Sequence, residues 1–260
     1  MTVPIFPKPS HSSSSTVPGG GRILQTTISV AFLLATLFTG FSPKMFSGKF
    51  GGIISGILTP QPEGMEPVPT TQKSVRIGIV SGHWGNGGDP GAVCPDGTNE
   101  LDVNLKIASL VRQKLEARGY NIDLLQEFDP RLEGYQAALM LSIHNDTCDV
   151  IDSEATGFKV AASSYSRDKN LTERLSACLE DRYGRVTSLQ YRSGNVTLNM
   201  TDYHAFRAVD PSTPSAIIEA GFLNLDRSIL VDHPDVVADG VVAGVLCFVK
   251  SESVQQVPTP

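Results

Sequence analysis

The sequence predicts an α/β fold: a mostly parallel sheet with helices on both faces, preceded by a single transmembrane helix. Three observations predict it. Short apolar runs alternate with helix-like periodic segments from residue 75 onwards. Several of these runs end at a polar residue. One uncharged apolar stretch lies near the N-terminus.

The alternation gives an order of elements. Short β-rich runs predict strands over residues 75–80, 120–125, 137–143, 157–162 and 215–218. Apolar residues at helical spacing predict helices over residues 100–118, 168–183 and 234–249. Thr98 or Asn99 is expected to cap the first helix, and Gly119 is expected to end it.

The N-terminal quarter has a different composition. Residues 1–22 are rich in Ser, Pro and Gly, which predicts a disordered arm. Residues 23–41 are apolar, no charge occurs between Arg22 and Lys44, and a helix of that length spans about 30 Å. A membrane anchor is the favoured interpretation. A cleaved signal peptide and a buried helix are the alternatives, but no A-x-A site follows and the run is apolar on all faces.

The remaining organisation follows from composition. Residues 42–74 are rich in Gly and Pro and are expected to form a linker, with a domain boundary near Ser74. A catalytic domain over residues 75–250 and a disordered tail over residues 251–260 follow. With a membrane anchor at 23–41, we expect a single-pass protein of the cell membrane whose catalytic domain lies outside the cytoplasm.

Charge limits the partners. The 260 residues carry a net charge of -6, and residues 1–74 hold five Lys/Arg against two Asp/Glu, so the rest of the chain carries -9. An acidic domain argues against nucleic acid as a partner, because phosphate binding needs clustered Lys and Arg. An uncharged glycan or a peptide remains compatible with this composition.

The four cysteines form no C-x-x-C pair, which argues against a zinc ribbon or finger. Cys178 and Cys247 lie in helix-like apolar patterns and are expected to be small buried residues. Cys94 and Cys148 lie in loops near two histidines. They can form a disulfide if the domain lies outside the cytoplasm.

Four polar residues are predicted to meet at one edge of the sheet. Predicted strands run into His83, His144 and Glu219, and Glu100 opens the first long helix at the same edge. Ligands of open α/β sheets bind beyond the carboxyl ends of the strands. Each residue alone has an ordinary explanation, since most histidines at strand ends bind nothing and a glutamate at a helix start favours the helix dipole. Their shared edge is what indicates a site.

The four residue types suit metal-assisted hydrolysis. Two imidazoles and one carboxylate form a three-ligand zinc site that leaves one position open. His83, Glu100 and His144 fit these ligand roles for one Zn²⁺ ion, and Glu219 fits a general base and acid. Gly82 and Gly85 are expected to let the loop after His83's strand turn sharply beside the metal.

The motifs SGHWGNGGDPGA, NELDVNLKIASLVRQKLEARGYNIDLL, LMLSIHND and PSAIIEAGFLN resemble those of zinc-dependent N-acetylmuramoyl-L-alanine amidases of the Amidase_3 family. The resemblance covers residues 75 to about 249. It implies a six-stranded α/β fold and cleavage of the amide between N-acetylmuramic acid and L-alanine in peptidoglycan or muropeptides. It also implies zinc ligands at His83, Glu100 and His144, with Glu219 as the catalytic carboxylate.

The chain departs from the family pattern at several positions. Trp84 stands where a glycine is common, Asn145 follows His144 directly, and the last motif is one residue short at Asn224. Trp84 either stacks on a sugar ring or walls the site. His204 either contacts substrate or is an ordinary loop histidine. The departures keep two alternatives open: a non-catalytic wall-binding or regulatory module, and a zinc hydrolase of another N-acyl amide.

Overall fold

The computed structural model describes residues 74–151, 153 and 155–254. Its strands are β1 (Arg76–Ser81), β2 (Asn121–Leu125), β3 (Leu139–Asp146), β4 (Lys159–Ala162) and β5 (Ser215–Phe222). Its α-helices are α3 (Glu100–Glu116), α4 (Lys169–Thr187), α5 (Leu198–Thr201), α6 (His204–Ala208) and α7 (Pro234–Val249). The predicted strands and long helices are thus present, with ends shifted by a few residues.

The predicted arm, membrane anchor and linker lie outside the described residues, apart from Ser74. Among the residues that the structure describes, none belongs to a helix long and apolar enough to cross a membrane. The anchor predicted over residues 23–41 therefore remains a prediction.

The sheet has the strand order β2-β1-β3-β5-β4. The pairs β1–β2, β1–β3 and β3–β5 are parallel, and β4–β5 is antiparallel. This confirms a mostly parallel sheet, but the described residues form five strands and not the six that the family resemblance implied. The segment between β2 and β3 forms only the 3-10 turn η2 (Pro130–Leu132), and the segment between α4 and β5 forms η3 (Ser193–Asn195), α5 and α6. The second segment adds only an isolated parallel bridge between Tyr191 and Phe158, which is too short to count as a sixth strand.

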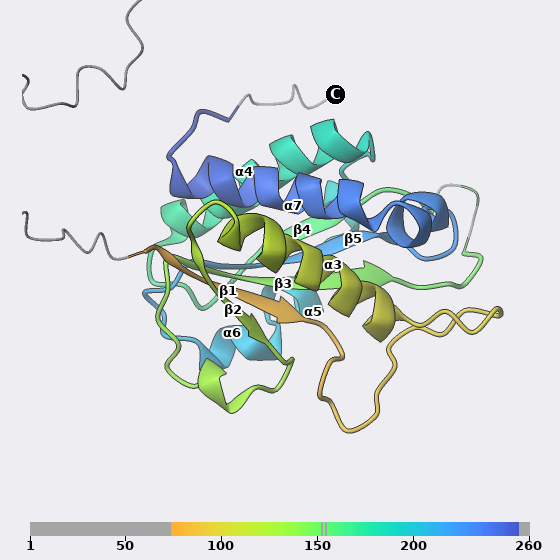
Figure 1. Cartoon of the computed structure of the whole chain (residues 1–260), viewed down its shortest axis with the longest axis horizontal. Coiled ribbons are helices and arrows are strands. Elements are labelled where there is room, and N and C mark those ends of the chain that lie inside the picture. The colour runs from red at the N-terminus through yellow and green to blue at the C-terminus, as the bar shows by residue number, and fades with distance from the viewer. Residues whose placement is uncertain (1–73, 152, 154, 255–260) are drawn as a thin grey trace, which may run out of the picture. The chain divides into compact units, whose positions relative to one another are not determined.

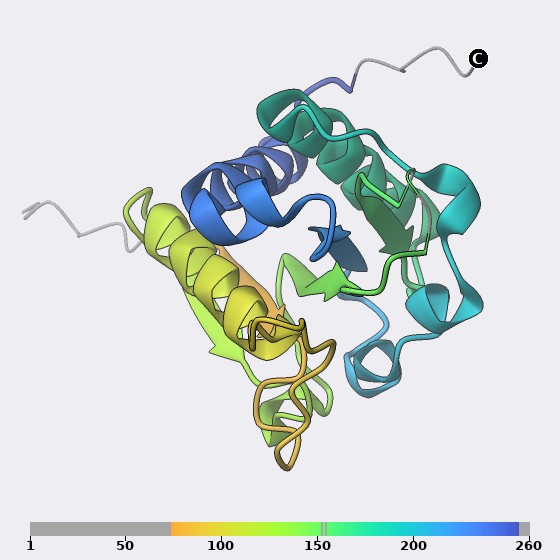
Figure 2. The ribbon, with the colours of Figure 1, turned by 90° about the vertical axis from the view of Figure 1, so that its right-hand side faces the viewer.

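Helices lie on both faces of the sheet, and Figures 1 and 2 show α3, α4 and α7 on one face and the short helices α5 and α6 on the other. Side chains alternate along the strands accordingly. Ile77 and Ile79 of β1 belong to the core under the long helices, whereas Val80 packs in the core with Phe206 of α6. The prediction of helices on both faces is confirmed, although the second layer is made of short pieces.

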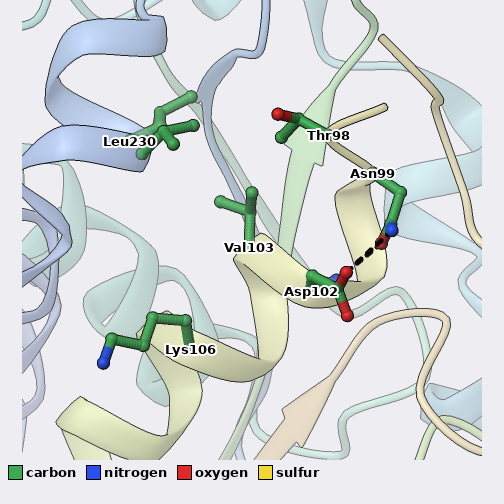
Figure 3. A pocket seen from close by; sticks show the side chains of 7 residues that line it. Thr98, Asn99, Asp102, Val103, Lys106 and Leu230 are labelled. Carbon is green, nitrogen blue, oxygen red and sulfur yellow. Dashed lines mark hydrogen bonds between the residues drawn. The ribbon is translucent and has the colours of Figure 1, made fainter. Parts of the chain in front are cut away.

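The start of α3 is fixed by a side-chain cap. The Asn99 side chain accepts a hydrogen bond from the main-chain N–H of Asp102 at 2.9 Å and donates to the Asp102 carboxylate at 2.8 Å, a pair visible in Figure 3. Asn99, and not Thr98, is therefore the cap. This cap places Glu100 as the first helical residue.

The four cysteines form two disulfides. Cys94 is bonded to Cys148, as the sequence allowed. Cys178 and Cys247 are fully buried, as expected, and they are also bonded to each other, which their sequence pattern did not indicate. Helices α4 and α7 pack together in one core and bring the two Cα atoms to 5.7 Å.

Candidate metal centre

The structure brings three of the predicted site residues into one cluster. His83 follows β1, Glu100 opens α3, and His144 lies in β3. One possible ligand atom from each lies within 4.8 Å of the others. His144 and Glu100 are 7% and 5% exposed, so the cluster is largely shielded from solvent. The predicted convergence of these residues at one edge of the sheet is confirmed.

Glu100 lies between the two histidines. Its Oε2 is 3.1 Å from His83 Nε2, and its Oε1 is 3.2 Å from His144 Nδ1. Each carboxylate oxygen therefore faces a different imidazole. This arrangement leaves one nitrogen of each ring directed toward the shared carboxylate and the other directed away from it.

Three further donors hold the Glu100 carboxylate in place. The main-chain N–H of Ala92 donates to Oε2 at 3.2 Å, and the main-chain N–H of Asn145 donates to Oε1 at 3.2 Å. The amide of Asn104, one helical turn after Glu100, donates to Oε1 at 3.1 Å. Asn145, a departure from the family pattern, also donates from its side chain to Asn104 at 2.7 Å. The departure thus belongs to the network that orients a ligand.

The electrostatics of the cluster are those of a cation site. Burial raises the pKa of Glu100, but the hydrogen bonds to His144 and His83 lower it more, and the net pKa is well below the ordinary value. The hydrogen bond to Glu100 raises the pKa of His83 to about 9. Burial lowers the pKa of His144, but the hydrogen bond to Glu100 and the nearby carboxylates raise it by more, so the net pKa lies above the ordinary value. Without a metal, the proton on His83 supplies positive charge that the carboxylate attracts.

The donor set fits Zn²⁺. Zinc takes imidazole nitrogens and carboxylate oxygens, and hydrolytic sites use three protein ligands. The described residues supply two histidines and one glutamate in a single buried cluster, with the carboxylate already oriented. The site therefore fits the predicted cofactor by the chemistry of its donors.

Each histidine has a partner on its outward nitrogen. His83 Nδ1 lies 3.0 Å from Asp89 Oδ2, and Asp89 is itself held by the N–H of Gly91 at 2.9 Å. His144 Nε2 lies 3.3 Å from the hydroxyl of Tyr203. Such outer partners orient metal-binding histidines. The sequence analysis did not identify Asp89 or Tyr203.

Glu127 is a third residue that the sequence analysis missed. It is 5% exposed and lies two residues after β2. Its Oε1 accepts from the Tyr203 hydroxyl at 3.0 Å, and its Oε2 accepts from the main-chain N–H of His83 at 2.8 Å. An acidic residue just after a predicted strand, at the same sheet edge as the other site residues, was the available signal.

Glu219 lies beside the cluster and is not part of it. It pairs with His144 in the parallel register of β3 and β5. Burial raises the pKa of Glu219 to about 7, and its Oε2 is shielded without a hydrogen-bond partner among the described residues. Lys159, opposite Glu219 on β4, forms an ion pair with Asp146. A carboxyl group with a pKa near neutrality is suited to taking and giving protons.

Glycines permit the close approach of these groups. A Cβ atom on Gly82 would lie 2.2 Å from Cε1 of His144, so only glycine fits beside that ring. Gly82 is not among the glycines with positive φ, and the predicted sharp turn instead involves His83 itself, with φ of 63°, and Gly85, with φ of 78°. Gly82 is therefore required for close packing and not for turning.

His204 and Trp84 both contact the main chain of Glu127. His204 opens α6, where its Nε2 lies 3.2 Å from the carbonyl of Glu127, and its ring stacks on the exposed Phe128. His204 is thus a helix-start residue and not a loop histidine. The Trp84 carbonyl accepts from the Glu127 N–H at 3.0 Å. These contacts place both residues next to the cluster.

A pocket shown in Figure 3 lies at the start of α3, beside Leu230. It is lined by Thr98, Asn99, Asp102, Val103, Lys106, Leu230 and Val231. None of the clustered histidine and glutamate side chains lines it, so the pocket is separate from the candidate metal centre.

The chain has a mostly parallel α/β sheet, and a His–Glu–His cluster and a further carboxyl lie at one edge of it. These features are typical of α/β domains with a hydrolytic metal site. The chain matches the Amidase_3 family, described as N-acetylmuramoyl-L-alanine amidase, over residues 77–246. It belongs to this family, as its motifs predicted.

Individual relatives agree with this assignment. The chain is 29% identical over 137 residues to the N-acetylmuramoyl-L-alanine amidase AmiC of Neisseria meningitidis serogroup B. That match covers 48% of this chain and only 30% of the relative's length. The chain therefore matches less than a third of that curated relative.

Solved structures share the fold. The CwlD amidase of Clostridioides difficile, solved in complex with the GerS lipoprotein, has a TM-score of 0.55 at 23% identity, covering 69% of this chain and 100% of that chain. The amidase AmiC2 of Nostoc punctiforme has a TM-score of 0.54 at 21% identity, covering 68% and 97% of the two chains. At these identities the likeness establishes the fold alone.

Proposed function

We propose that this protein is a zinc-dependent hydrolase that cleaves the amide bond between N-acetylmuramic acid and L-alanine in peptidoglycan. The observation that carries the proposal is the partly buried carboxyl of Glu219, whose shielded Oε2 has no hydrogen-bond partner among the described residues and which pairs with His144 of the His83–Glu100–His144 cluster. A cluster that served only to bind a metal for stability would need no such carboxyl. Membership of the amidase family supports the choice of bond.

The residues divide the chemical work. His83, Glu100 and His144 hold one zinc ion, which when bound polarises the scissile carbonyl and makes a water more acidic. Glu219 takes a proton from the attacking water and delivers it to the leaving amine of L-alanine. The amide C–N bond breaks, the lactyl group gains a hydroxyl to become a carboxylic acid, and the amine gains hydrogen.

We further propose that the catalytic domain acts outside the cytoplasm and is tethered by residues 23–41. The disulfides Cys94–Cys148 and Cys178–Cys247 support an oxidising compartment. The uncharged run between Arg22 and Lys44 supports the tether. Fractionation of cells that express the full chain tests this: membrane association should be lost when residues 23–41 are deleted. A full chain that stays in the soluble fraction would contradict the tether.

The activity is tested on isolated peptidoglycan sacculi with the full chain, purified in detergent and loaded with zinc. Mass spectrometry should find stem peptides with a free L-alanine amine and glycan strands with a free lactyl carboxyl. A chelator should abolish both products, and added zinc should restore them. Zinc binding without any cleavage would favour the wall-binding module instead. Cleavage of other N-acyl amides only would favour a different substrate.

A further inference from the structure

Glu127 is a buried acidic side chain that touches both histidines of the cluster without belonging to it. Its two carboxylate oxygens are used separately: Oε1 faces the hydroxyl of Tyr203, and Oε2 faces the main chain of His83. The proposed hydrolysis gives Glu127 no role, yet burial of an acidic group is costly unless it is hydrogen-bonded. Its contacts with residues of the cluster indicate that its role concerns the cluster.

The Tyr203 hydroxyl connects Glu127 to His144 with a defined direction. A hydroxyl has one donor and two acceptor positions. Tyr203 donates its proton to Glu127 at 3.0 Å and accepts from the Ser142 hydroxyl at 3.3 Å. The position that remains is an acceptor, and it lies 3.3 Å from His144 Nε2. A neutral His144 that binds a metal through Nδ1 therefore keeps its ring proton on Nε2, where the Tyr203 hydroxyl accepts it.

This direction determines which nitrogen is free to bind a metal. With the proton on Nε2, the lone pair of neutral His144 is on Nδ1. Nδ1 is the nitrogen that faces Glu100, at 3.2 Å. Without an acceptor at this position, the tyrosine could turn its proton toward Nε2 and favour the opposite tautomer. Glu127 prevents this because its Oε1 accepts from the Tyr203 hydroxyl while its Oε2 accepts from the His83 N–H.

The second oxygen of Glu127 holds the other histidine. His83 has a φ of 63°, a left-handed backbone conformation that residues other than glycine rarely adopt. The bond from its N–H to Glu127 Oε2 at 2.8 Å fixes the main chain at this point. Glu127 thus acts on the ring of one histidine and on the backbone of the other.

We propose that Glu127 is a positioning residue for the metal centre: through Tyr203 it fixes the tautomer of His144, and through the His83 N–H it fixes the direction of the second imidazole. The inference rests on the zinc-binding part of the proposed function. It goes beyond that function because it assigns roles to Glu127 and Tyr203. The orientation of both metal-binding rings depends on one carboxylate.

Two variants of the full chain test the inference. Glu127→Gln keeps the shape, but glutamine has one acceptor and one donor group, and both Tyr203 and the His83 N–H are donors, so one bond is lost. Tyr203→Phe leaves Glu127 bonded to His83 and removes only the path to His144. Glu133→Gln, at an exposed glutamate, and Tyr165→Phe, which removes a surface tyrosine–carboxylate bond to Asp202, are the matched controls.

Zinc affinity, measured by competition with a chromophoric chelator, is the first readout. Each test variant should bind zinc about 10- to 100-fold more weakly, the range for outer partners of metal-binding histidines, and each control should match the parent protein. The second readout is the ¹⁵N NMR pattern of the zinc-loaded protein. His144 should carry its proton on Nε2 in the parent protein, and its Nε2 signal should shift or broaden in Tyr203→Phe. A purely structural role would lower stability and leave this signal unchanged.

The outcomes separate the two proposals. A parent chain that binds no zinc would contradict the proposed function itself. A parent chain that binds zinc, with affinities in both test variants within twofold of the parent, would overturn the role of Glu127. If Glu127→Gln does not fold, Tyr203→Phe decides alone, because unchanged affinity and an unchanged Nε2 signal in that variant also overturn the inference.

Discussion

Glu219 lies directly opposite His144 in the parallel pair of β3 and β5. Paired residues of neighbouring strands point to the same side of a sheet, with backbones roughly 5 Å apart. The register therefore places a free carboxyl next to a candidate metal ligand. Because Glu100 already accepts from both histidines, Glu219 is left available for proton transfer.

The first prediction separates catalysis from metal binding. Glu219→Gln should lower kcat/KM on muropeptides by roughly 100-fold or more, because an amide cannot take the proton of a water. Zinc affinity should change little, since Glu219 is outside the His–Glu–His cluster. Activity assays and metal analysis of the same preparations check both statements. Full activity in this variant would remove Glu219 from the mechanism, and Glu133→Gln serves as the surface control.

The second prediction concerns stability against pH in metal-free protein. Burial raises the pKa of Glu219 from 4.5 to about 7. Because the folded pKa is the higher one, the resulting stability is fully present below pH 4.5 and is lost as pH rises through about 7. The loss is about 3 kcal/mol at most. Urea unfolding with a chelator present gives the free energy of unfolding of the parent protein and of Glu219→Gln. The difference between the two should fall as pH rises through about 7. A flat difference would contradict it.

Much of this fold and site could be predicted from local sequence signals. The five apolar runs predicted the five strands, and helical spacing predicted α3, α4 and α7. His83, Glu100 and His144 could be placed together because the carboxyl ends of parallel strands share one edge, a rule that needs no long-range detail. The six-stranded sheet implied by resemblance was wrong, because the connecting segments fold into turns and short helices.

What could not be predicted depends on contacts between distant segments. Tyr203 reaches His144 from a short helical region 59 residues away, and no periodicity indicates such a contact. Cys178 and Cys247 are 69 residues apart, and their pairing follows from the packing of α4 against α7. Glu127 carried a partial signal, since it follows a strand at the correct edge, but its two partners lie on different elements.

The third prediction concerns close packing at Gly82. A Cβ atom there would lie 2.2 Å from the His144 ring, so Gly82→Ala must displace that ring. We expect a loss of about 1–3 kcal/mol in the free energy of unfolding and weaker zinc binding. Gly194→Ala is the control, because nothing lies within 4 Å of the added atom. Chemical unfolding and chelator competition check both effects, and a Gly82→Ala variant that binds zinc like the parent would contradict the geometry.

The fourth prediction concerns the protons that the protein releases when zinc binds. The hydrogen bond to Glu100 raises the pKa of His83 to about 9, so this ring is protonated in metal-free protein at neutral pH. Zinc needs neutral imidazoles, so binding should release about one proton from His83 at pH 7 and become tighter as pH rises toward 9. Calorimetry in buffers of different ionisation enthalpy counts the released protons. The Glu219→Gln variant is used because it removes the contribution of the Glu219 carboxyl and leaves that of the histidines. Zinc affinity independent of pH would show that the His83 ring starts neutral.

The fifth prediction compares the two disulfides. Cys94–Cys148 joins the segment between His83 and Glu100 to the segment just after His144, so it restrains the elements that carry all three ligands. Cys178–Cys247 joins α4 to α7 on the covering layer. Replacing either pair with alanine should lower stability by about 2–4 kcal/mol, because loop sizes of 54 and 69 residues are similar. Only the first replacement should also weaken zinc binding, since only that bridge limits the relative motion of the ligands. Equal zinc affinities in the two double variants, measured by chelator competition, would mean that the sheet and α3 alone hold the metal centre together.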